Sequence, residues 1–263
     1  MPTLLRHLLR SWPRARDRAM RRYRLFVTVL ALAALALLAG CGGSDPEAPN
    51  PPANQPTVLF LHGGAWVGGS PAELEPLAAT YRKHGYNAIS IAYRDGDNNI
   101  LHLIDNVEAE VAKHRSKGPV ILYGVSAGGT LAAAVAAAGK VDGGVVIGAP
   151  TDLETWSSNP YQGSLAKKVL DGLGMTPDQQ RDASPINRLG EKPAPQLLQY
   201  GDRDEFVPVQ QGEIYLRAAR TRQPKLDIEL ETMRGVDHTG ALAYTPTYAA
   251  SALQWIQQRW PSR

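Results

Sequence analysis

Short apolar runs alternate with amphipathic stretches from residue 57 to the end of the chain. TVLFLHGG (residues 57–64) and PVILYGVS (119–126) are almost wholly apolar before they reach a turn, which is typical of strands buried on both faces. Residues 72–85 and 100–118 instead repeat apolar positions at helical spacing and end at a glycine, which predicts helices. Buried strands that alternate with helices predict an α/β fold, in which helices cover both faces of a mostly parallel sheet.

The alternation has one interruption, at residues 152–192. This segment holds three prolines and no strand-like run, and we expect one or two short helices there. An irregular segment of this length inside a domain is more often functional than idle, so it is predicted to form a small cap insertion in a domain of residues 57–263. Further strands are predicted at 86–94, 141–150, 195–202 and 225–233, and further helices at 127–139, 208–222 and 246–260.

Residues 1–40 form a leader that differs from the rest of the chain. Basic residues precede an apolar run at 25–39, which is short for a bilayer span of roughly 20 residues and predicts a secretion signal. LAGC (38–41) resembles the lipobox of bacterial lipoproteins. The resemblance implies cleavage before Cys41 and acylation of this residue. Residues 41–56, rich in proline and glycine, would then be the lipidated cysteine and a flexible tether.

Lipidation of Cys41 would hold the domain on a membrane, on the periplasmic or cell-surface side of the cytoplasmic membrane, and the outer membrane is one candidate. The alternative is an uncleaved anchor helix that ends in a lone thiol. Translation from Met20 instead of Met1 would give the signal ordinary proportions, and both starts stay open.

The charge of the chain is concentrated in this leader. The whole sequence carries a formal charge of +3, from 28 Lys and Arg against 25 Asp and Glu, and residues 1–40 contribute eight arginines and one aspartate. The rest therefore has 20 basic and 24 acidic residues, a balance of −4. This balance argues against nucleic acid as a partner. No metal-ligand spacing, phosphate-binding loop or dinucleotide fingerprint is present, so no metal or cofactor is expected.

A candidate nucleophile lies where strand 119–126 passes into helix 127–139. Gly124-Val-Ser126-Ala-Gly128 matches G-x-S-x-G in a strand-to-helix context. A sharp turn there would leave the Ser126 hydroxyl at the carboxyl end of the sheet and direct the Ala127 amide at the same place. Serine needs a base and an orienting acid to become a nucleophile.

His238 is the candidate base, because it follows the last predicted strand. Two other histidine groups have different explanations: His7 leaves with the leader, and His84, His102 and His114 lie on predicted helices. Three aspartates are candidates for the acid, namely Asp202, Asp204 and Asp237.

HGGAW (62–66) resembles the H-G-G-G-[FWY] oxyanion loop of hormone-sensitive-lipase-like esterases. Together with GVSAGG (124–129), Tyr93-Arg94 and SPINRL (184–189), it makes residues 57–260 resemble the α/β-hydrolase superfamily, in its hormone-sensitive-lipase and carboxylesterase branch. Ala65 replaces the third glycine of that loop, which is compatible with donation by its backbone amide. Two features depart from that branch: Val125 stands where it commonly has Asp, and the predicted sheet starts directly at strand 57–61, without the usual leading strands. The arylformamidases and the polyester or acetyl-carbohydrate esterases therefore stay open as relatives.

The resemblance implies a role for each residue. Asp204, counted from Gly201 in the pattern G-x-x-D-x-x-V-P, would be the acid, and Asp202 would stabilise its turn. The amides of Gly64, Ala65 and Ala127 would form the oxyanion hole, while His62 would brace the loop. Trp66, Trp156 and Tyr161 are candidates for substrate contact or, equally, for packing.

The sequence thus predicts a membrane-anchored serine hydrolase that cleaves small-molecule carboxylic esters through an acyl-enzyme on Ser126, His238 and Asp204. An amidase, arylformamidase or peptidase on the same triad is one alternative. A non-catalytic surface lipoprotein on a hydrolase scaffold is the other.

Overall fold

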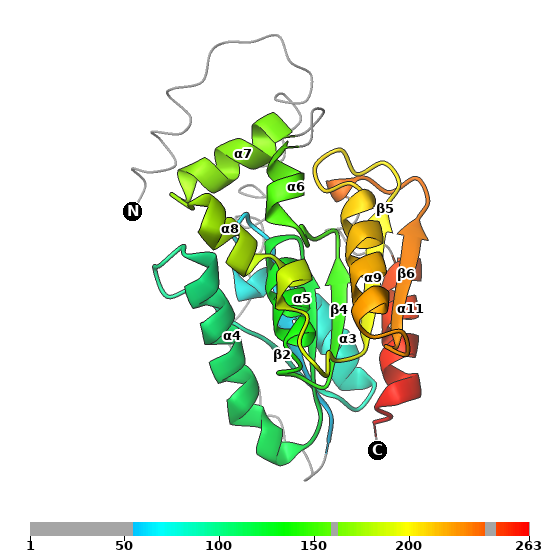
Figure 1. Cartoon of the computed structure of the whole chain (residues 1–263). Coiled ribbons are helices and arrows are strands. Elements are labelled where there is room, and N and C mark those ends of the chain that lie inside the picture. The colour runs from blue at the N-terminus through cyan, green and yellow to red at the C-terminus, as the bar shows by residue number, and fades with distance from the viewer. Residues whose placement is uncertain (1–54, 159–162, 240–245, 263) are drawn as a thin grey trace. The chain divides into compact units, whose positions relative to one another are not determined.

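The computed structural model describes residues 55–158, 163–239 and 246–262 (Figure 1). These residues belong to one compact unit, Pro51–Arg263. The predictions for the leader at 1–40, for Cys41, for most of the tether and for Tyr161 lie outside the described residues. In the residues that the structure describes, no helix is long and apolar enough to cross a membrane.

A parallel sheet forms the centre of the domain (Figure 1). Its strand order is β2-β1-β3-β4-β5-β6, and each neighbouring pair is parallel. This confirms the predicted α/β class. The strands are β1 (Thr57–Leu61), β2 (Asn87–Ser90), β3 (Val120–Val125), β4 (Gly143–Ile147), β5 (Gln196–Gly201) and β6 (Ile228–Met233).

The strands are continuously apolar because both faces of the sheet are covered. Along β1, Leu59 and Leu61 point into one core cluster, while Val58 and Phe60 point into the other. Successive side chains of a strand alternate between faces, so a strand with helices on each side needs apolar residues at every position. The edge strand β6 has exposed and half-buried positions between its buried ends.

The helices divide between the two faces (Figure 1). Residues of α4, α5 and α9 contribute to the first core cluster, and residues of α3 and α11 to the second. The bounds are α3 (Glu75–Lys83), α4 (Ile100–His114), α5 (Ala127–Ala137), α9 (Gln210–Arg222) and α11 (Pro246–Arg259), with 3-10 turns η1 (Pro71–Glu73), η2 (Arg115–Lys117) and η3 (Pro185–Arg188).

Helix α5 is buried along its whole length. Its sequence, AGGTLAAAVAA, is made almost wholly of small residues. Small side chains let its backbone lie close to the sheet: a Cβ added to Gly129 would come 2.7 Å from the Cβ of Ala149. A helix of larger residues could not occupy this position without moving the sheet or its neighbours.

In its described residues, the segment predicted as a cap holds three short α-helices, more than the one or two expected: α6 (Leu153–Ser158), α7 (Gly163–Gly172) and α8 (Pro177–Ala183). Gln211 of α9 holds the residues at the start of the cap segment. The Gln211 side-chain oxygen accepts hydrogen bonds from the amides of Thr151 and Asp152, both at 2.9 Å. The Thr151 hydroxyl donates to the Gln211 carbonyl at 2.6 Å. The cap is thus attached to the domain by buried polar contacts.

Candidate active site

Ser126 lies on a strained turn between β3 and α5. Its backbone has φ 53° and ψ −118°, a region that costs a non-glycine residue on the order of 1–3 kcal/mol. The Ser126 amide donates to the Ile147 carbonyl at 2.8 Å, and its carbonyl accepts from the Thr130 amide at 3.0 Å. These bonds and the packing of α5 hold the turn in place.

The two glycines of the motif are required by close backbone contacts. A Cβ on Gly124 would lie 2.3 Å from the Gly128 carbonyl oxygen, and a Cβ on Gly128 would lie 2.2 Å from the Leu61 oxygen and 2.5 Å from that of His62. The second contact also shows that the start of the HGGAW loop lies directly against the Ser126 turn.

The structure brings Ser126, His238 and Asp204 together in one hydrogen-bonded chain. The Ser126 Oγ is 3.1 Å from His238 Nε2, and His238 Nδ1 is 2.7 Å from Asp204 Oδ2. A carboxylate only accepts, so Nδ1 carries the proton and Nε2 of the neutral ring is left to accept from the serine hydroxyl. The Asp204 carboxylate is fully buried, while the His238 side chain is 16% exposed.

Asp204 is held by its own turn as well. Its Oδ1 accepts from the amides of Phe206 at 2.9 Å and Val207 at 2.7 Å. Asp202, the alternative acid, is exposed, and its Oδ1 accepts from the Gly235 amide at 2.6 Å. The geometry therefore pairs His238 with Asp204, and Asp202 stabilises the adjoining turn.

The HGGAW loop contains three successive residues with positive φ: Gly64 (114°), Ala65 (51°) and Trp66 (61°). The Gly64 carbonyl accepts from the amides of Val67 and Gly68 at 3.1 and 2.8 Å, which closes the loop into a tight turn. Ala127 is the first residue of α5, so its amide is one of those at the helix start that have no intrahelical acceptor. The oxyanion role of Gly64, Ala65 and Ala127 stays a prediction.

The His62 side chain stabilises this loop. Its Nδ1 donates to the Gly63 carbonyl at 2.7 Å, and its ring stacks on Tyr93 with centroids 4.4 Å apart. The Tyr93 hydroxyl in turn donates to the His62 carbonyl at 2.8 Å. Burial lowers the pKa of the His62 imidazole, and the charge of Arg94 lowers it further, although the hydrogen bond to Gly63 opposes this shift. His62 is thus a neutral brace.

Trp66 and Trp156 are only 1% exposed, which favours packing, one of the two roles that the sequence left open for them, over substrate contact. Their rings meet edge to face, with centroids 6.2 Å apart. Side chains with so little free surface pack the cap against the HGGAW loop; they do not line an open pocket. The sequence did not point to Phe206 or Gln211 as site residues, although Phe206 lies inside the G-x-x-D-x-x-V-P pattern that singles out Asp204.

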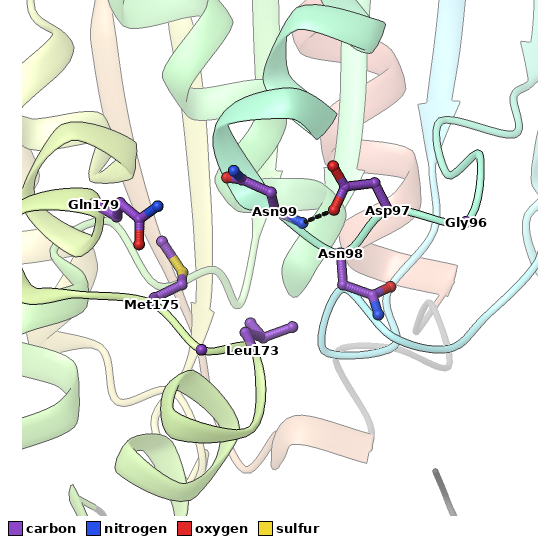
Figure 2. Close-up of a pocket in the computed structure, with 8 residues that line it drawn as sticks. Gly96, Asp97, Asn98, Asn99, Leu173, Met175 and Gln179 are labelled. Carbon is purple, nitrogen blue, oxygen red and sulfur yellow. Dashed lines mark hydrogen bonds between the residues drawn. The ribbon is translucent and has the colours of Figure 1, made fainter. Parts of the chain in front are cut away.

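A polar cavity of about 280 Å³ lies between the loop before α4 and the cap (Figure 2). Asp97, Asn98 and Asn99 line it on one side, and Met175 and Gln179 on the other. The backbone amide of Asn99 donates to Asp97 Oδ1 at 2.9 Å, which shapes the loop. None of the three residues of the candidate triad lines this cavity. In the described part of the chain, no group of three or more metal-ligating side chains occurs.

Known structures share this fold. Thermogutta terrifontis esterase 2, solved as its sarin-phosphonylated form, matches with a TM-score of 0.68 at 18% identity, over 82% of this chain and 88% of that one. Its apo form matches with a TM-score of 0.66 at 19% identity, over 83% and 88%. The fold is that of the α/β-hydrolases, as the sequence predicted.

The family is defined more narrowly by sequence. The BD-FAE family model matches residues 47–218, and the chain belongs to that family. Esterase LipC of Mycobacterium tuberculosis is 29% identical over 208 residues, which cover 66% of this chain and 50% of LipC. The chain thus spans about half the length of this curated relative.

We expect Gly124→Ala to destabilise the domain strongly, because the new Cβ would meet the backbone of Gly128 and α5 cannot move away from the sheet. The free energy of unfolding should fall by about 3 kcal/mol or more, measured by urea denaturation. Gly172→Ala is the matched control, since nothing lies within 4 Å of its added Cβ. Equal stability of the two variants would contradict the packing argument.

The lowered pKa of His62 predicts a loss of stability in acid. In the unfolded chain His62 binds a proton near the ordinary pKa of 6.5, and in the folded protein its pKa is lower. The stability that neutral His62 contributes to the fold is therefore fully present above pH 6.5 and is lost as the pH falls through the folded pKa. The free energy of unfolding, measured between about pH 7.5 and about pH 5, should fall less in His62→Gln than in the wild type. Identical slopes would show that His62 does not titrate differently on folding.

Proposed function

We propose that the protein is a serine hydrolase that cleaves carboxylic esters through an acyl-enzyme on Ser126. The observation that carries the proposal is the continuous chain from Ser126 Oγ through His238 to the buried Asp204 carboxylate. The strained turn adds support, because it holds the Ser126 hydroxyl at the carboxyl end of the sheet, and backbone strain of this kind gathers at functional sites.

In the first step His238 Nε2 takes the Ser126 proton as Oγ attacks the ester carbonyl. Asp204 keeps the imidazole in the tautomer that accepts at Nε2 and stabilises the imidazolium that forms. His238 then returns the proton to the departing alcohol, which leaves an acyl group on Ser126. A water molecule, activated by the same histidine, hydrolyses this intermediate and releases the acid.

Negative charge develops on the carbonyl oxygen in both steps. We assign its stabilisation to the amides of Gly64, Ala65 and Ala127, because the HGGAW loop lies against the Ser126 turn and because the start of α5 carries the positive end of the helix dipole. Each donor of this kind is worth roughly a hundred- to a thousandfold in kcat.

An ester is favoured as substrate because the relatives in sequence and in fold are named esterases. An amidase or peptidase would use the same intermediate and differ in the protonation of its leaving group. Rates on p-nitrophenyl esters of increasing chain length, compared with those on matched aryl amides, separate these activities.

Ser126→Ala should lower kcat for p-nitrophenyl esters by about a millionfold, because the nucleophile is lost while the site remains. The full chain, purified in detergent, should also lose its labelling by a fluorophosphonate probe. Ser251→Ala on α11, whose hydroxyl bonds to Glu231, is the control and should retain both. Undiminished hydrolysis by Ser126→Ala would refute the mechanism, and an unlabelled wild type would favour the non-catalytic alternative.

We further propose that Cys41 anchors the protein to a membrane outside the cytoplasm, on the strength of the LAGC pattern and the signal-like leader. In a bacterial host fed labelled palmitate, the wild type should take up label and sediment with membranes. Cys41→Ser should do neither, because the thiol is the acyl acceptor and cleavage depends on it. Equal labelling of both chains would rule out this anchor.

A further inference from the structure

Trp156, on the cap helix α6, makes a single hydrogen bond that leads to the candidate active site. Its indole Nε1 donates to the carbonyl oxygen of Phe206 at 2.9 Å. Trp156 is 1% exposed, so its indole N–H is largely shielded from competing water. Phe206 is two residues beyond Asp204 and belongs to its turn.

The Phe206 carbonyl shares one peptide group with the Val207 amide, and that amide donates to Asp204 Oδ1 at 2.7 Å. A donor on the oxygen of a peptide group polarises the group and strengthens hydrogen bonding by its N–H. The order of donation is therefore from Trp156, through the peptide of residues 206 and 207, to the Asp204 carboxylate. From the other side, the Ser126 hydroxyl donates to His238 Nε2 and His238 Nδ1 donates to Asp204 Oδ2, so both hydrogen-bonded chains end on the Asp204 carboxylate.

The aromatic rings follow the same path. Trp156 meets the ring of Phe206 edge to face, with centroids 5.5 Å apart and an interplanar angle of 81°. Phe206 meets the imidazole of His238 at 5.0 Å and 71°. On its other side Trp156 contacts Trp66 of the HGGAW loop. One cap residue thus touches, directly or through a single neighbour, the loop, the acid turn and the base.

We propose that Trp156 is a positioning residue for the reaction on Ser126, and that through it the cap insertion sets the orientation of Asp204 and His238. The inference rests on the proposed function. Its indole N–H orients the peptide that binds Asp204 Oδ1, and its ring fixes Phe206 against the imidazole. The cap then contributes to the chemical step itself.

Trp156→Phe tests this role, because it keeps an aromatic ring and removes the donor. The matched control is Trp255→Phe. Trp255 is also buried, also donates its Nε1, to Glu229 at 3.1 Å, and also meets a second ring edge to face, that of Trp260 at 5.6 Å. It lies in the other core cluster, on α11. Trp255→Phe therefore measures how much activity is lost when a buried, hydrogen-bonded tryptophan is replaced by phenylalanine away from the site.

In full-chain protein, Trp156→Phe should lower kcat by about fivefold and leave KM within about twofold, since one neutral hydrogen bond supports the transition state indirectly. The low-field proton resonance of His238 Nδ1, followed by NMR, should shift from its wild-type position. Trp255→Phe should change neither. Benzothienylalanine at position 156, which retains the bicyclic shape without the N–H, covers the case in which Trp156→Phe does not fold, and should reproduce its effects.

The inference is overturned if the Trp156 variants retain the wild-type kcat and resonance, or if Trp255→Phe alters both to the same degree. The NMR signal does not require turnover, so it also separates this inference from the proposed function. If the wild type hydrolyses no ester but its His238 resonance still shifts in Trp156→Phe, the proposed reaction is refuted and the hydrogen-bonded chain from Trp156 to His238 is supported. If the wild type hydrolyses esters but Trp156→Phe changes neither kcat nor the His238 resonance, the proposed reaction stands and the positioning role of Trp156 is refuted.

Discussion

The close approach of α5 to the sheet is the constraint on which the rest of the site depends. Gly124, Gly128 and Gly129 let the helix backbone lie within van der Waals contact of the strand ends, and alanines continue the same fit along its length. The contact holds Ser126 in a backbone conformation that it would not otherwise adopt, and it places the HGGAW loop beside it. Strain at one residue is stable here because the surrounding core leaves the helix no other position.

Polar contacts then connect this rigid centre to its less regular surroundings. Gln211 ties the start of the cap to α9, and the indole of Trp156 ties α6 to the acid turn. The Trp156 and Gln211 side chains are buried, so breaking either interaction would leave a polar group without a partner and largely away from water. The Trp156 contact attaches the cap to the turn that holds Asp204, and it is the contact through which we propose that the insertion acts on the site.

Much of the architecture followed from the sequence pattern. The apolar runs located the strands, because a parallel sheet covered on both faces requires apolar residues at every position, and the glycines around Ser126 indicated the turn. The cap was less predictable: its prolines excluded long helices, but only the structure showed how the segment divides into α6, α7 and α8. Trp156 could not be assigned from sequence, since an aromatic residue in a cap suits a pocket wall and a packing role equally well.

The sequence by itself determined the fold class, the order of the elements and the identities of the serine and histidine that meet. These properties depend on local patterns: periodicity, turn glycines and the position of a residue relative to a strand end. The family resemblance pointed to Asp204 and to a bracing role for His62. Only the tertiary structure decided that Asp204 contacts His238, which contacts His62 makes in its loop, and that Trp156 donates toward the acid turn. Those outcomes depend on distances between residues far apart in the chain, and no local pattern encodes such distances.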